Sequence, residues 1–161
     1  MTYLRCAFIL LLLTESGFSY ADSCRIDITA NDMMQFNQHE LSVASDCTEV
    51  ELTLKHVGSQ PAKVMGHNWV LAKTRDVQSL ANEGAAAGFA HDFQPTGDAR
   101  ILAATRIVGG GESTTIKFST ATLQNDENYS FFCSAPGHYG VMKGRFKFGG
   151  DADRVASRSV K

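Results

Sequence analysis

The 161-residue sequence has no hydrophobic run long enough to cross a membrane and no cluster of basic residues. Its main apolar run is Ala7–Leu13, whereas a membrane-spanning helix needs roughly 20 residues. The 15 lysines and arginines are scattered and the formal net charge is −2, so we expect no nucleic-acid partner. The sequence also lacks an internal repeat and any sign of a second domain. These absences favour one compact domain without a membrane span in its mature form.

The first 21 residues have the pattern of an export signal. Arg5 supplies the positive charge, Ala7–Leu13 the apolar segment and Ser19–Ala21 a cleavage site of small residues. A transmembrane anchor is the alternative, and the short apolar run argues against it. We therefore expect a signal peptide at residues 1–21, cleaved near Ala21, and an exported chain.

Cysteine is scarce, with four residues in the chain. Export removes Cys6, and the odd number that remains implies one pair and one thiol with a separate role. Cys24 and Cys47 have no neighbouring histidine and no CxxC partner, so we interpret them as a structural disulfide. Such a bond would contribute about 3 kcal/mol through the unfolded state. Cys133 is then the functional thiol.

Short alternating segments separated by turn residues predict an all-β fold, a Greek-key sandwich or antiparallel barrel. The segment at 76–87 is the one predicted helix, because Val77, Leu80 and Ala81 are spaced i, i+3, i+4. We expect a single domain at 22–149 and a disordered tail at 150–161, which has no apolar run to pack. His56 continues the apolar phase of its strand, so we interpret it as a core histidine with hydrogen-bonded ring nitrogens. The predicted strands are 24–30, 41–43, 48–56, 67–72, 101–108, 114–118, 129–133 and 142–148.

The segment from Cys133 to Met142 places a thiolate, an imidazole and a thioether within ten residues. Copper that cycles between Cu(I) and Cu(II) uses these ligands, in a trigonal set of one cysteine and two histidines with a long axial methionine. Four residues separate Cys133 from His138, and three separate His138 from Met142. A loop this short can direct all three side chains at one ion, so the pattern predicts a mononuclear copper site.

The second imidazole must come from elsewhere in the chain, and His67 is the strongest candidate. The carbonyl of Gly66 can approach the metal closely because glycine has no Cβ. We expect the backbone N–H groups of Asn68 and Ala135 to donate to the sulfur of Cys133 and raise the reduction potential.

Four motifs carry a resemblance to a known family: Asn31–Asn37 (NDMMQFN), Val64–Leu71 (VMGHNWVL), Phe131–His138 (FFCSAPGH) and Val141–Gly144 (VMKG). From Ser23 to Phe148 the sequence resembles the azurins, bacterial blue copper proteins of the cupredoxin fold. The resemblance implies His67, Cys133 and His138 as ligands of one copper ion, with Met142 and the Gly66 carbonyl as weak axial groups. It also implies the Cys24–Cys47 disulfide and an internal role for His56.

By the same resemblance, the protein would be a periplasmic electron carrier rather than an enzyme, and we expect a monomer. Its transient partners would be c-type cytochromes, reductases or dehydrogenases. We expect an apolar docking patch around an edge of His138, formed by Met34, Val64, Met65, Ala135, Gly137, Tyr139 and Val141. Ala135 departs from the family, in which a bulkier residue, often phenylalanine, is usual at this position.

The main alternative is a periplasmic copper chaperone or storage protein, for which exposed Met or His clusters and an open site are expected. A cysteine hydrolase would pair Cys133 with His138, but this leaves His67 and Met142 unexplained. A binuclear copper centre needs a second cysteine in the loop, and residues 134–137 contain none. A structural zinc site would need four strong ligands, and methionine is a poor one.

Overall fold

The structure is a computed structural model that describes residues 24–150. The predicted signal peptide lies outside the described residues, and so does all but the first residue of the predicted tail. The domain boundaries at 22 and 149 therefore stay predictions.

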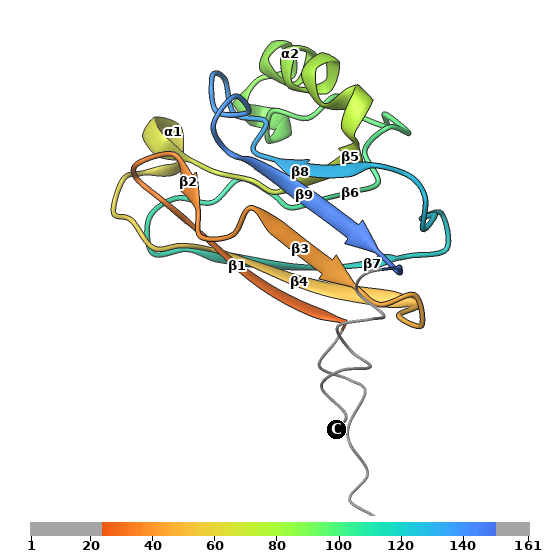
Figure 1. The fold of residues 1–161 in the computed structure, drawn as a ribbon. Helices are drawn as coiled ribbons and strands as arrows, with labels where there is room; N and C mark the ends of the chain where they lie inside the picture. The colour runs from red at the N-terminus through yellow and green to blue at the C-terminus, as the bar shows by residue number, and fades with distance from the viewer. Residues whose placement is uncertain (1–23, 151–161) are drawn as a thin grey trace, which may run out of the picture.

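Two β-sheets pack face to face (Figure 1). The first has the order β2-β1-β4-β7 and the second the order β3-β9-β8-β5-β6, which confirms the predicted all-β class. The first sheet consists of β2 (Gln35–Phe36), β1 (Arg25–Asn31), β4 (Glu49–His56) and β7 (Ser113–Ser119). The second consists of β3 (Glu40–Val43), β9 (Lys143–Phe148), β8 (Tyr129–Phe132), β5 (Val70–Lys73) and β6 (Ala103–Ala104).

The sheets are mixed rather than antiparallel throughout. Strand β1 pairs with β4 in parallel, and β3 pairs with β9 in parallel. The reason is that β3 lies in the second sheet, so the chain crosses between sheets before it returns beside β1. In the second sheet, β5 and β8, which flank the predicted ligands, pair with each other in antiparallel fashion.

Helix α2 (Val77–Ala87) lies where the sequence predicts it and covers part of the outer face of the second sheet (Figure 1). Its apolar side packs on that sheet through a cluster of Val70, Ala72, Val77, Leu80, Ala81 and Phe132. Helix α1 (Ala62–Met65) is a single turn that the sequence pattern does not predict. Two short 3-10 turns, Thr74–Asp76 and Phe89–His91, flank α2. Within residues 24–150, no helix is long and apolar enough to span a membrane.

The predicted strand at 101–108 is reduced to the two residues of β6. The hydroxyl of Thr105 accepts the backbone N–H of Trp69 at 2.9 Å. The Thr105 hydroxyl thus takes the place of a backbone carbonyl that would accept this hydrogen bond in a regular sheet. Beyond this point His67 pairs with Val108 as an isolated bridge. His67 is therefore held beside the sheet rather than within a regular strand.

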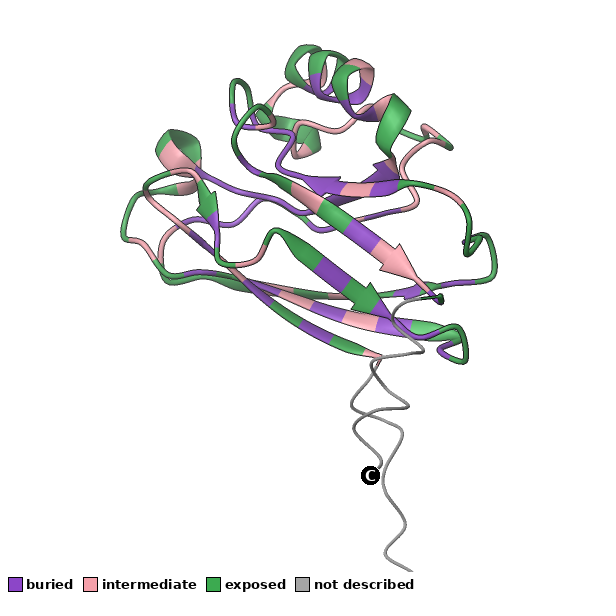
Figure 2. Ribbon diagram, viewed as in Figure 1, coloured by how far each residue is buried: buried purple, intermediate pink, exposed green. Residues whose placement is uncertain are grey.

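The core lies between the two sheets, and the strands bury alternate side chains, as Figure 2 shows. In β4, Val50, Leu52 and Leu54 are fully buried, as the alternating pattern predicts. The indole of Trp69 is fully buried among Phe118, Phe131 and Phe146, with ring centroids 5.9 to 6.3 Å away.

A disulfide joins Cys24 to Cys47, with a Cα–Cα distance of 5.6 Å, and this confirms the predicted pairing. It connects the residue before β1 to the turn before β4, the strand that pairs with β1. The bond therefore ties together the starts of the two inner strands of the first sheet, and leaves Cys133 as the free cysteine of the described chain.

Replacement of both Cys24 and Cys47 by serine should lower the free energy of unfolding of the metal-free protein by about 3 kcal/mol, because the unfolded chain gains conformational freedom. Urea denaturation of the metal-free variant and wild type measures the difference. An unchanged unfolding midpoint would show that the disulfide does not stabilise the fold.

Candidate metal centre

The loop between β8 and β9 is closed by its own backbone hydrogen bonds. The N–H of Cys133 donates to the carbonyl of Met142 at 3.0 Å, and the N–H of Met142 donates to the carbonyl of His138 at 2.8 Å. His138 itself donates to Ala135 at 3.0 Å. Gly137 has a positive φ of 82°, which permits the reversal of the chain within this loop. The two ends of the predicted ligand loop are thus directly paired.

His67 lies close to the ligand loop in space but comes from a distant segment, the one that leads into β5. Its backbone N–H and carbonyl both pair with Val108, at 3.0 and 2.8 Å. Its Nε2 lies 2.9 Å from the carbonyl oxygen of Asn31. A carbonyl oxygen only accepts hydrogen bonds, so Nε2 carries the proton. The lone pair of Nδ1 is therefore free to bind a metal.

Three donor atoms converge in the interior. The Sγ of Cys133 lies 3.8 Å from Nδ1 of His67 and 3.5 Å from Nδ1 of His138. All three atoms lie within 4.8 Å of one another, and the three residues are buried. Residues 24–150 contain no other such group of His, Cys, Asp and Glu side chains. The set of one thiol and two imidazoles predicted from sequence is therefore assembled in space.

The two predicted axial groups lie close to this cluster along the chain. Met142 ends the ligand loop and its side chain is fully buried. Gly66 precedes His67, and a Cβ at Gly66 would collide with the carbonyl of Ala62 and the side chain of Ile107. The close packing explains why glycine stands here. The axial roles of Met142 and the Gly66 carbonyl remain predictions.

Burial keeps the cluster uncharged in the metal-free protein. Desolvation raises the pKa of the Cys133 thiol to about 11, although hydrogen bonds from the backbone N–H groups of Asn68 and Ala135 oppose it. Desolvation also lowers the pKa of His67 to about 4 and lowers that of His138. At neutral pH the imidazoles are ready to bind a metal, and the proton that a metal displaces is that of the thiol.

Asn68 joins the two segments that carry the donor atoms. Its Oδ1 accepts the N–H of Ser134 at 2.9 Å, and its Nδ2 donates to the hydroxyl of Ser134 at 2.8 Å. Asn68 is fully buried and Ser134 nearly so. The sequence pattern indicates Asn68 only for its backbone N–H, and it indicates neither the side-chain amide of Asn68 nor Ser134. The adjacency of Ser134 to Cys133 is the only indication of Ser134 in the sequence.

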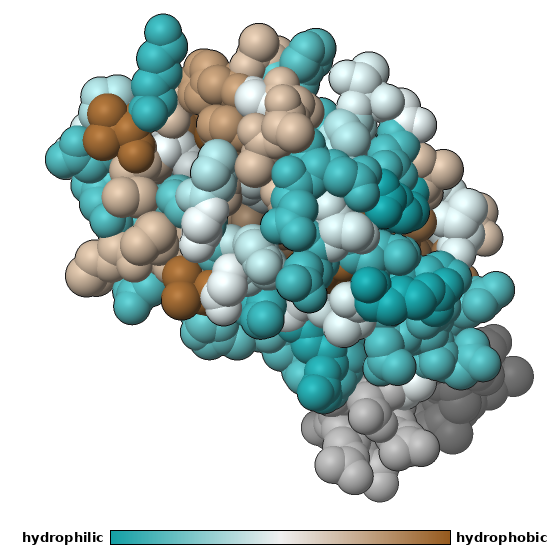
Figure 3. Space-filling view, turned by 90° about the horizontal axis from the view of Figure 1, so that it is seen from above, coloured by the Kyte–Doolittle hydropathy of each residue, from teal (hydrophilic) through white to brown (hydrophobic). Residues whose placement is uncertain are grey.

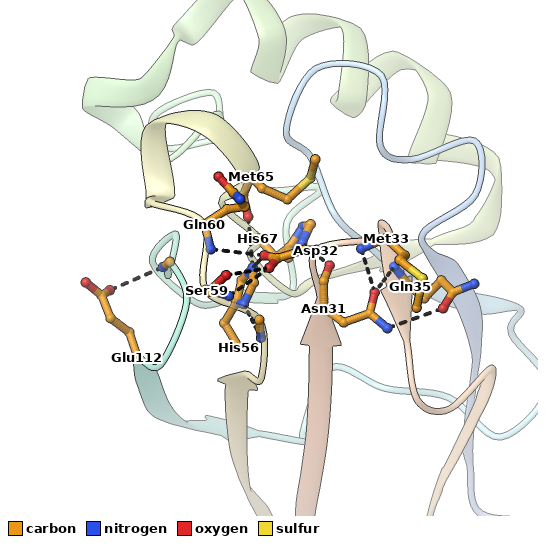
Figure 4. A network of polar contacts seen from close by, with 12 residues as sticks. Asn31, Asp32, Met33, Gln35, His56, Ser59, Gln60, Met65, His67 and Glu112 are labelled. Carbon is orange, nitrogen blue, oxygen red and sulfur yellow. Dashed lines mark hydrogen bonds and ion pairs between the residues drawn. The ribbon is translucent and has the colours of Figure 1, made fainter.

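His56 supports His67 from behind (Figure 4). The two rings stack with centroids 4.8 Å apart and planes inclined by 14°. The Nε2 of His56 lies 2.9 Å from the carbonyl of Met65, and its Nδ1 accepts the N–H of Gly58 at 3.0 Å. The interpretation of His56 as a core histidine with both ring nitrogens hydrogen-bonded is confirmed.

Asp32 anchors the loop that passes over His56, and the sequence reveals it only as part of a turn. Its carboxylate accepts the N–H of Ser59 at 2.7 Å and that of Gln60 at 3.2 Å. The bond from Ser59 is the main reason that the pKa of Asp32 is lowered. The same carboxylate lies 3.7 Å from Nε2 of His56. Figure 4 shows these contacts converging beside His67.

The end of the molecule near α1 and the ligand loop carries several exposed apolar residues. Val64 is 65% exposed and Val141 is 61% exposed. Met34, Met65 and Tyr139 are half-buried, and Gly137 is exposed. In Figure 3, hydrophobic side chains gather mainly toward the side on which Figure 1 shows α1.

Two residues differ from the predicted patch. Ala135 is only 5% exposed, so it lies beneath this surface rather than on it. Its small side chain is covered by its neighbours. Met33, which is not part of the predicted patch, is 68% exposed. Tyr139 packs partly against the α2 cluster. His138 keeps 9% of its surface exposed.

The donor set fits copper. One soft sulfur and two imidazole nitrogens in a buried cluster match the trigonal ligand set of blue copper sites. A closed structural zinc site would instead require a fourth strong nitrogen or sulfur ligand, and the cluster of the described residues contains three.

Comparisons with known proteins agree with this geometry. Residues 22–149 match the family described as copper binding proteins, plastocyanin/azurin family. Azurin from Bordetella pertussis is 45% identical over 137 residues, which cover 85% of this chain and 91% of the relative. Azurin iso-2 from Methylomonas sp. strain J is 45% identical over 125 residues, which cover 78% of this chain and 97% of the relative.

A solved structure of azurin Az-iso2 from Methylomonas sp. strain J has the same fold. It superposes with a TM-score of 0.77 at 44% identity and covers 80% of this chain and 99% of the solved chain. With a matching fold, a matching family over most of the chain and a ligand cluster that fits one copper ion, this chain belongs to the plastocyanin/azurin family of copper-binding proteins.

Proposed function

We propose that this protein is a mononuclear blue copper electron carrier. The observation that carries the proposal is the buried cluster of Cys133, His67 and His138, whose segments are held in place by hydrogen bonds. The bound copper would supply single-electron chemistry between Cu(I) and Cu(II). A site whose ligands are fixed by the fold needs little rearrangement when an electron arrives or leaves.

In this proposal each residue has a defined role. Cys133, His67 and His138 would hold the ion, and Met142 and the Gly66 carbonyl would serve as weak axial ligands. The carbonyl of Asn31 fixes the tautomer of His67. The backbone N–H groups of Asn68 and Ala135 stabilise negative charge on the sulfur of Cys133, which favours the reduced state and raises the potential.

Electrons would pass between His138 and transient partners at the apolar end of the molecule. Exposed Val64 and Val141 support a docking patch there, together with Met34, Met65, Gly137 and Tyr139. Redox encounters bury less than about 1,200 Å², so a small apolar surface suits rapid release. The relatives are azurins, and we propose c-type cytochromes, reductases or dehydrogenases as partners of a monomeric carrier.

We propose the periplasm as the location of the mature protein. The Cys24–Cys47 disulfide supports an oxidising compartment, and the sequence pattern of residues 1–21 supports export.

An enzymatic role for Cys133 has little support. A catalytic cysteine needs a lowered pKa and access to its substrate, whereas burial raises the pKa of Cys133 to about 11. A copper chaperone or storage protein is the second candidate, but it needs ligands that exchange with solvent or a partner. His67 and Cys133 are both fully buried, which favours retention of the ion over its delivery.

The wild-type protein should turn intensely blue when Cu(II) is added, through charge transfer from the Cys133 thiolate to the metal. Cys133→Ser should abolish the colour and leave the far-UV circular dichroism unchanged. His39→Ala, at an exposed histidine outside the cluster, is the matched control and should stay blue. A wild-type protein that binds copper without colour would refute the proposed centre.

Met142→Gln should lower the reduction potential, because an amide oxygen stabilises Cu(II) more than a thioether does. Cyclic voltammetry of the variant and wild type measures the change. If the potential is the same in both proteins, Met142 is not an axial ligand.

A further inference from the structure

The side-chain amide of Asn68 makes a third hydrogen bond that leads away from the ligand loop. Its Nδ2 donates to the backbone carbonyl of Asp92 at 2.7 Å, in addition to the two bonds with Ser134. Both amide protons and the amide oxygen are thus engaged. The orientation of Asn68, and through it the placement of Ser134 beside Cys133, depends on where the carbonyl of Asp92 lies.

That carbonyl is placed by an unusual backbone. Asp92 has a φ of 53° and a ψ of 27°, and Phe93 follows with a φ of 54°. Non-glycine residues rarely adopt this left-handed conformation, although aspartate tolerates it better than bulky residues do. Hydrogen bonds from the N–H of Asp92 to Phe89 and from that of Phe93 to Gly88, both 3.0 Å, hold the turn. Strain of this kind persists only where the surrounding contacts impose it.

The carboxylate of Asp92 reaches the other half of the site. Its Oδ1 accepts the N–H of Ile107 at 2.8 Å. The next residue, Val108, pairs with His67 through both its backbone N–H and its carbonyl. Asp92 therefore makes hydrogen bonds both to Asn68, which holds Ser134 beside Cys133, and to Ile107, which precedes the residue that pairs with His67. The carbonyl of Asp92 holds the Asn68–Ser134 pair, and its carboxylate holds the segment against which His67 is docked.

Helix α2 packs closely against the turn at Asp92 and Phe93. A Cβ at Gly84 would collide with the carbonyl oxygen of Phe93 and would lie 3.6 Å from the Cβ of Ser134. Glycine at this position therefore lets the helix approach the Phe93 carbonyl, while the distance to Ser134 is an ordinary van der Waals contact. In Figure 1, α2 and the segment that follows it lie above the sheet that leads into the ligand loop.

We propose that Asp92 is a positioning residue for the metal centre, which fixes the geometry around Cys133 through Asn68 and Ser134 and around His67 through Ile107 and Val108. The inference rests on the proposed copper site. It assigns a role to a residue in a loop that no ligand motif includes, and it makes the turn at Asp92 and Phe93 part of the site.

Three substitutions at Asp92 separate its contributions. Asp92→Asn keeps the size, the tolerance for left-handed backbone and an oxygen that accepts the N–H of Ile107, so it is the matched control for loss of charge. Asp92→Gly keeps the backbone conformation but removes the acceptor. Asp92→Ala removes the acceptor and also disfavours the left-handed backbone that directs the carbonyl to Asn68.

The perturbation of the metal centre should increase in the order Asp92→Asn, Asp92→Gly, Asp92→Ala. We expect Asp92→Asn to match wild type in reduction potential, in the relative intensity of its visible bands and in Zn(II) affinity. Asp92→Ala should shift the potential, alter the bands and weaken Zn(II) binding about ten-fold or more, the range found when partners of metal ligands are removed. Asp92→Gly should lie between them. A general loss of stability alone would not move the potential.

A measurement without metal tests the same link. Hydrogen exchange of the Ser134 backbone amide and the Asn68 side-chain amide should be faster in metal-free Asp92→Ala than in Asp92→Asn. Gly84→Ala, which displaces the carbonyl of Phe93 instead, should change the exchange in the same direction. If Asp92→Ala does not fold, Asp92→Gly is compared with Asp92→Asn in its place.

The inference is overturned if Asp92→Ala and Asp92→Gly retain the potential, band ratio, Zn(II) affinity and exchange rates of Asp92→Asn. It is equally overturned if all three variants shift alike, because the lost charge would then be the cause. These outcomes differ from a failure of the copper proposal, in which the wild-type protein itself would not develop the blue colour.

Discussion

The hydrogen-bonded pairing of Asn68 with Ser134 is the constraint on which the site depends. It joins the segment that carries His67 to the segment that carries Cys133, by two buried hydrogen bonds between residues far apart in sequence. Buried polar groups of this kind are costly unless every donor and acceptor is satisfied. Once satisfied they specify one arrangement. The fold itself therefore holds the two donor segments against each other.

The sandwich supplies the scaffold for that pairing. Strands β5 and β8 lie side by side, with Val70 opposite Phe132, so the residues beyond their ends meet at one end of the sheet. The aromatic core around Trp69 and Phe131 fixes the separation of the two sheets. At the same end, the stacked ring of His56 and the carbonyl of Asn31 leave His67 one orientation. Rigid surroundings of this kind suit transfer of an electron with little movement of the ligands.

The sequence predicts the metal ligands and the strands because each is specified by residues that lie close together along the chain. The spacing of Cys133 and His138 and the motif around His67 identify the donor atoms that the structure brings together, and strand alternation predicts the layers. The supports are not local. The roles of Ser134, Asp32 and Asp92 arise from contacts across 24 to 66 positions, which no periodicity reveals. The burial of Ala135 likewise depends on neighbours from other segments.

The central claim is that the fold holds one sulfur and two imidazoles around the copper in a single arrangement for both oxidation states. X-ray absorption at the copper edge tests it directly in the oxidised and reduced protein. The account predicts one short sulfur neighbour and two nitrogen neighbours in each state, with nearly the same distances, and the sulfur of Met142 at a longer distance. A centre without sulfur, or a coordination number that changes with reduction, would contradict it.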